Sequence, residues 1–521
     1  MDSPVDGQIQ KQPLSKRIIR NTLYNALGAG CLMLVSLILT PYIIKNIGIE
    51  KFGIWAIANV LIAYFGFFDF SMSTPVVKYA SEFHILSDSS KLNQLFNTAF
   101  VFYLCLAVAT GITCFIFLKP LLNFFSIPPG IYKEALFVVG MSVVSFMLLM
   151  VFNTFNSLLV GLQYMDTTSR IVIFSSIIST IGTVYVLSNG YGLRGLSVNY
   201  LFVIFASGII SAIMAFRKLP EIRFNPFCSK ASMFKLLFGF GVKLHVAKIA
   251  FLVSFQIDKI LLARFLTLAS VTFYELGSKI AFTIRRVSFL LVSAIVPAAS
   301  EMSTTRERAA VYNFYLRCSK YLISISIPLF LFFIFNARQI LFAWIGEVYI
   351  ESVIVLQLLA VGYLASVFTG ALATTAAGMG KPEFEMKRGL LVVPLNLALS
   401  LILIIKIGLI GACIGTMVSL VVGDVFMLKS FHAYLGRPVK DFINLIYKPF
   451  AASLLAILSS FLVHHLSVVQ SPRINSIVIL LLKAAIVALS YIVIIFAIRF
   501  FDGQDLDLFK KRMPVFRRLF N

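Results

Sequence analysis

Long apolar segments separated by short polar stretches follow one another along most of the chain. Windows of about 20 mostly apolar residues recur about fourteen times, and this is the length that a helix needs to cross a bilayer. The segments lack the alternation typical of barrel strands, so the pattern predicts an all-α integral membrane protein. The predicted spans are 23–44, 52–77, 94–118, 134–160, 168–189, 193–216, 234–262, 271–297, 318–336, 350–376, 389–406, 408–430, 446–466 and 477–500.

Composition supports this interpretation. The 521 residues are 59% hydrophobic and 13% charged, and the mean hydropathy is +0.93. The polar segment before Leu23 lacks a short apolar core followed by a cleavage site, so we expect the first span to be retained. The six cysteines are scattered without a CxxC pair, which predicts neither a disulfide framework nor a metal site, and we expect no cofactor.

Basic residues are distributed unevenly between the loops. With the N-terminus inside, about 29 of the 45 Lys and Arg fall on the cytoplasmic side and about nine fall outside. This asymmetry predicts a multi-pass membrane protein with both termini in the cytoplasm. The net charge of +23 therefore reflects orientation in the membrane, and no nucleic-acid partner is predicted.

Three short motifs recur in the same order at nearly constant spacing. They are ASE at 80 and 299, GLQ at 161 with GMG at 378, and GLRG at 192 with GLIG at 408. The repeat predicts two pseudo-symmetric six-helix lobes related by an axis along the membrane normal, with two extra helices and a cavity between the lobes. The predicted parts are an N-lobe (1–216), a cytoplasmic linker (217–233), a C-lobe (234–430), the extra helices (431–500) and a basic tail (501–521). The tail is either an amphipathic helix on the anionic inner leaflet or a solvated segment.

Two neighbouring spans carry an unusual number of charges. The stretch GVKLHVAKIAFLVSFQIDKI begins at Gly241, and the next span contains ELGSKIAFTIRRVSFLL from Glu275. A Lys or Arg at a helix centre costs about 2.5 to 3.5 kcal/mol on the insertion scale, whereas a Leu or Ile returns about 0.3 to 0.6 kcal/mol. Exposure of these side chains to lipid is therefore disfavoured.

Helical geometry gathers the charges into stripes. At about 100° per residue, His245, Lys248 and Lys259 lie within about 60° of one another, and Glu275, Lys279 and Arg286 within about 40°. The two quoted stretches together hold six basic and two acidic residues, a net of +4. In the corresponding spans of the first lobe, Asp69 is the one clearly internal charge, among aromatic residues.

This pattern predicts a hydrated, cationic cavity wall that favours an anion with a large apolar or sugar part, because Arg matches phosphate geometry and Lys adds mobile charge. The predicted contacts to the anionic headgroup are Lys243, His245, Lys248, Lys279, Arg285 and Arg286. Candidates for proton or sodium coupling are Asp69, Asp258 and Glu275.

Structural interpretations of the same residues stay open. Lys259 can extend toward the interface and pair with Asp258, and Glu275 can form an ion pair with Lys279. His245 is equally compatible with packing, and Asp69 with a hydrogen bond between helices. Asp424, near the cytoplasmic end of span twelve, is interpreted as structural.

Several segments resemble those of a known family. They are the polar entry into span one, the connection IGIEKFGIWA, the end of span two FFDFSMSTPVVKYASE, and the glycine turn after span ten. The chain is similar to the polysaccharide transporter family, the Wzx-type O-antigen flippases of the MOP superfamily. The resemblance implies a fourteen-helix flippase, not an enzyme, that moves an undecaprenyl-diphosphate-linked oligosaccharide to the periplasmic leaflet by alternating access. It also implies a role in lipopolysaccharide biosynthesis beside a polysaccharide polymerase and chain-length machinery.

Three other functions compete with this one. A lipid II flippase also carries a diphosphate lipid. A multidrug antiporter exports organic cations, which a wall of net charge +4 would repel. A membrane glycan polymerase is expected to have a sizeable outer loop, and the sequence predicts none.

Overall fold

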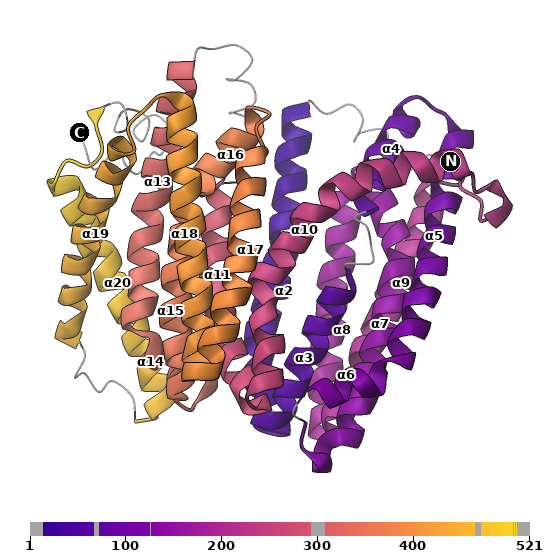
Figure 1. Ribbon diagram of the computed structural model, residues 1–521, viewed down its shortest axis with the longest axis horizontal. Coiled ribbons are helices and arrows are strands. Elements are labelled where there is room, and N and C mark those ends of the chain that lie inside the picture. The colour runs from indigo at the N-terminus through magenta and orange to yellow at the C-terminus, as the bar shows by residue number, and fades with distance from the viewer. Residues whose placement is uncertain are drawn as a thin grey trace. The chain divides into compact units, whose positions relative to one another are not determined.

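The computed structural model describes residues 14–66, 72–125, 127–292, 308–463, 470–503, 505 and 507. The regular structure of these residues is helical, with no strand among them (Figure 1). The chain divides into two compact units, Met1–Thr272 and Phe273–Asn521.

The first unit contains nine helices within the described residues, α2 to α10, and a short 3-10 turn. They are α2 (Leu14–Ile47), α3 (Ile49–Phe65), α4 (Ser73–Ile85), α5 (Ser89–Ile116), α6 (Leu118–Phe124), α7 (Pro129–Gly161), α8 (Met165–Ser188), α9 (Gly192–Lys218), η2 (Pro226–Cys228) and α10 (Ala231–Phe265).

The helix α11 begins at the end of the first unit and continues into the second. The second unit is built from α11 (Leu268–Val292), α13 (Arg308–Phe335), α14 (Ala337–Ile345), α15 (Ile350–Phe368), α16 (Gly370–Gly378), α17 (Glu383–Ile407), α18 (Leu409–Leu435), α19 (Lys440–Ser460), η3 (Phe461–Val463) and α20 (Pro472–Ala497).

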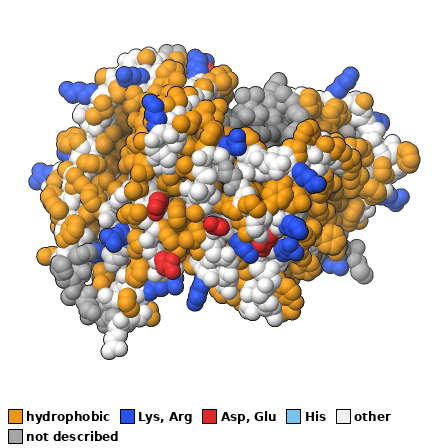
Figure 2. Space-filling model, turned by 60° about the horizontal axis from the view of Figure 1, so that its bottom comes forward, with side chains coloured by type: hydrophobic (Ala, Val, Ile, Leu, Met, Phe, Trp, Pro, Cys, Tyr) orange, Lys and Arg blue, Asp and Glu red, His pale blue; other side chains and the backbone are white. Residues whose placement is uncertain are grey.

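Eleven helices in the described part of the chain are long and apolar enough to cross a membrane. The predicted all-α membrane fold is therefore confirmed. Large apolar side chains such as Ile38, Leu481 and Val493 are exposed on these helices, and hydrophobic side chains cover much of the face seen in Figure 2. Exposed apolar surface of this extent fits contact with acyl chains.

Three predicted spans are not among the eleven. The second span is not one continuous helix, because α3 ends at Phe65 and α4 begins at Ser73; residues 67–71, with Asp69, lie outside the described residues. The helix α10 is continuous, but the side chains of 240–254 are not described. The helix α11 is too rich in charge to count by composition, since it carries Glu275, Lys279 and two adjacent arginines.

The backbone repeats itself at two of the motifs that the sequence singled out. Gln163 and Gly380 both have positive φ angles, 62° and 70°, and each follows the end of a helix. Gly192, with φ of 56°, is the first residue of α9, and Gly408, with φ of 64°, directly precedes α18. The third motif pair cannot be compared, because its second copy at 299–301 lies outside the described residues.

Helix packing follows the same repeat within each unit. In the first unit α7 packs on α5 and α9, and α8 packs on α9. In the second unit α15 packs on α13 and α18, and α17 packs on α18. The helices α5, α7, α8 and α9 correspond in order to α13, α15, α17 and α18, so the same three packed pairs occur in both units. The predicted lobe boundaries stay a prediction. The helix α10 belongs to the first unit, where it contacts α3, α4 and α5.

The linker after α9 is bound to α5 by paired asparagines. The amide of Asn93 donates to the carbonyl of Glu221 (2.7 Å) and accepts from the N–H of Arg223 (2.7 Å). One turn further, Asn97 donates to the carbonyl of Arg223 (3.0 Å) and accepts from the N–H of Asn225 (2.8 Å). Each side chain therefore satisfies backbone groups of a linker segment that belongs to no helix or sheet.

Candidate functional site

The predicted substrate-contacting residues fall on two helices that belong to different units. Lys243, His245 and Lys248 are on α10, but their side chains lie outside the described residues, as Asp69 does. Lys279, Arg285, Arg286 and Glu275 are on α11, within the second unit. The described part of the candidate site is therefore the charged stripe of α11.

This stripe runs along one accessible face of α11. Glu275 and Lys279 are partly exposed, and Arg286 is exposed. Phe282 lies between them in the helical order and its ring centroid is 5.9 Å from the Arg286 guanidinium carbon. A cation stacked beside an aromatic ring on an accessible face can bind an anionic group and also contact a sugar ring.

Arg285 points to a different neighbour, α15. Its guanidinium carbon is 4.6 Å from the centroid of Phe289 and 6.0 Å from that of Tyr363 on α15. Phe282 meets Tyr363 edge-on, with ring centroids 6.2 Å apart, within the range of about 4.5 to 7 Å usual for aromatic pairs. The two adjacent arginines therefore share the ring of Phe282 but face different surroundings.

Close packing holds α11 against α15. A Cβ atom at Gly277 would lie 2.6 Å from the carbonyl oxygen of Ser352, so only glycine allows the two backbones to approach this far. Ala281 and Ile284 on the same helix are buried. The charged stripe is consequently carried by a helix with a fixed position in the second unit.

A buried ionic network lies within electrostatic range of Arg285. The Asp424 carboxylate, 3% exposed, accepts from Arg388 Nε (2.6 Å), Thr369 (2.8 Å) and Ser366 (3.1 Å). Arg388 also donates to Glu385 (3.1 Å), and Asp424, Glu385 and Arg388 interact electrostatically with Arg285. These contacts support the structural interpretation of Asp424.

At the far end of α10, Asp258 and Lys259 are buried, at 1% and 8% exposure. Lys259 Nζ donates to Gln256 Oε1 (2.9 Å) on the same helix, and Asp258 interacts electrostatically with Tyr64 of α3. Asp258 thus contributes to packing in the first unit, and its role in ion coupling stays a prediction. Among the described residues, no group of three His, Cys, Asp or Glu side chains could hold a metal ion.

Sequence reasoning missed two cations that are buried or largely buried. Arg388, just before the predicted span 389–406, was not singled out, although it lies in α17 against Asp424 with a side chain that is 12% exposed. Lys483 is 4% exposed in the middle of α20 and donates to Gln339 (2.8 Å) and Asn336 (3.3 Å) of α14 and its preceding residue. The available signal was the position of Lys483 well inside the otherwise apolar span 477–500.

A family model described as "Polysaccharide biosynthesis protein" matches residues 18–303. The chain belongs to this family. This chain is 22% identical over 417 residues to a Shigella flexneri protein described as an O-antigen transporter. The match covers 79% of this chain and 97% of the relative. The predicted family is confirmed, and its members are transporters and not enzymes.

Solved structures show the same fold at low sequence identity. The lipid II flippase MurJ in an inward closed conformation matches with a TM-score of 0.70, at 15% identity, over 91% of this chain and 98% of MurJ. An inward-facing multidrug transporter of the MATE family, in the MOP superfamily, matches with a TM-score of 0.65, at 14% identity, over 80% and 94%. The Vibrio cholerae MATE transporter VcmN matches with a TM-score of 0.59, at 14% identity, over 81% and 97%.

Proposed function

We propose that this membrane protein is a flippase for an undecaprenyl-diphosphate-linked oligosaccharide, which it moves from the cytoplasmic to the periplasmic leaflet of the bacterial inner membrane by alternating access. The observation that carries the proposal is the stripe of α11, where Lys279 and Arg286 stand on an accessible face beside Phe282. The Shigella flexneri relative supports the same substrate class through its description as an O-antigen transporter.

The proposed mechanism uses the basic residues to replace the water of the headgroup. The diphosphate docks against Lys279, Arg285 and Arg286 of α11, and contacts with Lys243, His245 and Lys248 of α10 stay a prediction from the sequence. The polyprenyl tail stays in the bilayer throughout. The attraction has to remain moderate, because a headgroup that is held too tightly cannot leave on the other side. Glu275 lowers the net charge of the stripe and serves this purpose.

The test is export of a surface glycan by cells whose own copy is replaced by variants. Arg285→Gln with Arg286→Gln removes both guanidinium groups, and we expect export to fall at least about tenfold, equivalent to about 1.4 kcal/mol of lost binding. The paired Arg→Lys changes keep the charge and should retain most export. Arg437→Gln, which removes an exposed arginine after α18, is the matched control.

Membrane abundance of each variant has to be measured by immunoblot. Full export by a well-expressed double Gln variant would refute the docking role of these arginines. If export falls equally in the double Gln variant and in the Arg437→Gln control, the loss comes from removing positive charge in general and not from this site.

The lipid II flippase is the second candidate, because MurJ shares the fold over 91% of the chain. The two functions differ in what cells lose. Depletion of a peptidoglycan flippase lyses cells, whereas depletion of a surface-glycan flippase removes the glycan and leaves cells intact. Rescue of cells depleted of their lipid II flippase by this chain would decide for the second candidate.

A further inference from the structure

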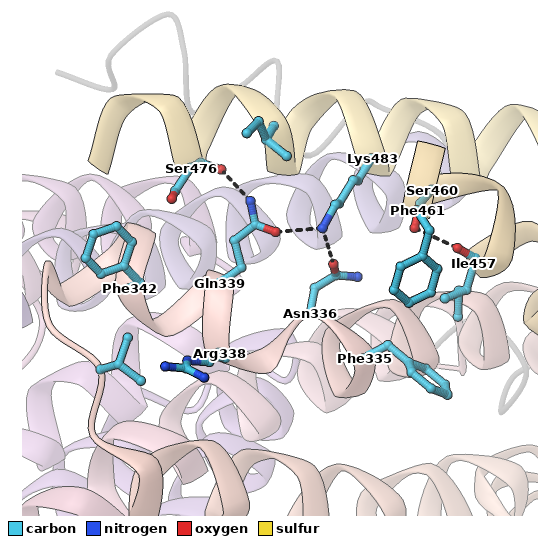
Figure 3. Close-up of a pocket in the computed structure, with 12 residues that line it drawn as sticks. Phe335, Asn336, Arg338, Gln339, Phe342, Ile457, Ser460, Phe461, Ser476 and Lys483 are labelled. Atoms are coloured by element: carbon cyan, nitrogen blue, oxygen red, sulfur yellow. Dashed lines mark hydrogen bonds between the residues drawn. The ribbon is translucent and has the colours of Figure 1, made fainter. Parts of the chain in front are cut away.

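The second unit contains a cavity that the proposed function does not use. It has a volume of about 480 Å³ and lies between α14, the ends of α13 and α19, and the first half of α20 (Figure 3). Cavities that bind small ligands usually measure about 300 to 1,000 Å³. This cavity is therefore large enough for a headgroup with one or two rings.

The polar lining of the cavity is cationic. Its twelve lining residues include Lys483 and Arg338 and no acidic side chain. Lys483 is buried and is oriented by the amide oxygens of Gln339 and Asn336, as Figure 3 shows. Arg338 is exposed, in the first turn of α14. Lys483 is thus preorganised, and Arg338 adds a second positive charge that can adjust to a ligand.

Aromatic and hydrogen-bonding groups complete the lining. Phe335 and Phe461 are 54% and 56% exposed, and Phe342 lines the cavity from α14. The amide of Gln339 also donates to the carbonyl of Ser476 on α20 (3.4 Å), which connects the polar groups of both helices. Rings beside cations and amides form a surface that suits an anionic group joined to a polyol or sugar.

A purely structural role for Lys483 accounts for only part of this arrangement. Contacts with Gln339 and Asn336 would fix α20 against α14 without any cavity and without Arg338. A charged side chain in the middle of an apolar spanning helix indicates a functional site by default, because its insertion is unfavourable. Since the cavity lies beside membrane-spanning helices, a membrane-borne ligand reaches it more readily than a soluble one.

We propose that this cavity binds the phosphate-bearing headgroup of an anionic lipid, held by Lys483 and Arg338 with its polyol or sugar against Phe335 and Phe461. The site is separate from the α11 stripe, and its ligand is either a bilayer phospholipid or the polyprenyl diphosphate lipid itself. Both present anionic phosphate oxygens to the two cations, one as a phosphodiester and the other as a diphosphate, so the experiment has to distinguish them.

Tryptophan fluorescence provides the measurement. The chain has two tryptophans, Trp55 and Trp344, and Trp344 lies in α14, two residues after Phe342. In a Trp55→Phe background, full-length protein in phosphatidylcholine nanodiscs is titrated with brominated phosphatidylglycerol, whose bromines quench Trp344 on binding. Lys483→Gln with Arg338→Gln should raise the half-saturating lipid fraction at least tenfold, and Lys448→Gln on α19 should leave it unchanged.

Two further arms identify the source of the phosphate. If a synthetic polyprenyl-diphosphate-linked N-acetylglucosamine displaces the brominated lipid at lower concentration than unlabelled phosphatidylglycerol does, the site holds the transported lipid; the reverse order assigns it to a bilayer lipid. Glucose 1-phosphate, a soluble phosphate, should not displace the brominated lipid.

The proposal fails if brominated phosphatidylcholine quenches equally, or if the double variant titrates like the parent. If Lys483→Gln prevents folding, Arg338→Gln alone keeps the test decisive, because this exposed side chain can be removed without a packing defect and its loss should weaken binding about threefold. An unchanged titration of Arg338→Gln would then overturn the proposal.

Discussion

At the scale of single residues, two buried carboxylates of the second unit are neutralised by compact local networks. Asp424 is held by Arg388, Ser366 and Thr369. Asp505, fully buried beyond the end of α20, accepts from Lys320 (2.5 Å) and from Tyr321 on α13. Such pairing is expected near a bilayer, because an unpaired charge cannot be stabilised by water there.

The network around Asp424 gives a prediction on stability. Asp424→Asn removes the negative charge that faces Arg388, whose side chain is 12% exposed, and we expect the free energy of unfolding to fall by about 3 kcal/mol. The measurement is unfolding by sodium dodecyl sulfate in mixed micelles, followed by circular dichroism.

Glu385→Gln serves as the control for the same network. Its side chain is 54% exposed, so its ion pair with Arg388 should contribute less than about 1 kcal/mol. Equal stability of parent and Asp424→Asn would show that Arg388 is neutralised by other groups.

At the scale of elements, the linker after α9 is part of the first unit and not a free connection. Asn93 and Asn97 on α5 form hydrogen bonds with the linker backbone at alternate residues, Glu221, Arg223 and Asn225. Thr98 extends the contact by accepting from the N–H of Lys230 (3.1 Å). These hydrogen bonds therefore restrain the linker as part of the first unit.

Asn97→Ala should release the linker locally. Two hydrogen bonds to buried or half-buried backbone groups are lost, each contributing about 0.5 to 1.5 kcal/mol, so amide exchange at 223–225 should accelerate about tenfold. Hydrogen–deuterium exchange with mass spectrometry measures this change. Asn46→Ala is the matched control, because its side chain only bonds to the carbonyl of Tyr42 on its own helix (2.8 Å). Unchanged exchange in Asn97→Ala would mean that the ladder does not restrain the linker.

At the scale of the whole molecule, the distribution of basic residues predicts its orientation in the membrane, with both termini inside. In a variant without its six cysteines, Asn189→Cys after α8 should react with a membrane-impermeant maleimide in intact spheroplasts. Lys429→Cys, exposed near the end of α18, should react only after lysis. The opposite pattern would reverse the orientation and with it the proposed direction of transport.

Hydrophobic pattern was a good guide to the helices because spanning segments need about 20 apolar residues whatever their neighbours are. Described helices overlap all fourteen predicted spans, and the repeat was visible because turns such as those at Gln163 and Gly380 demand the same backbone at equivalent positions. The break between α3 and α4 was missed, since hydropathy stays high through FGFFDF and does not register a helix end.

The sequence by itself determined that this is a multi-span helical membrane protein of the polysaccharide biosynthesis family, with excess positive charge on two adjacent spans, because both properties depend on local composition. Only the tertiary structure decided which buried charges meet: that Arg388 faces Asp424, that Arg285 stands against Tyr363, and that Lys483 faces a cavity beside Arg338. These contacts join helices far apart in the chain, and their partners depend on packing that no single segment encodes.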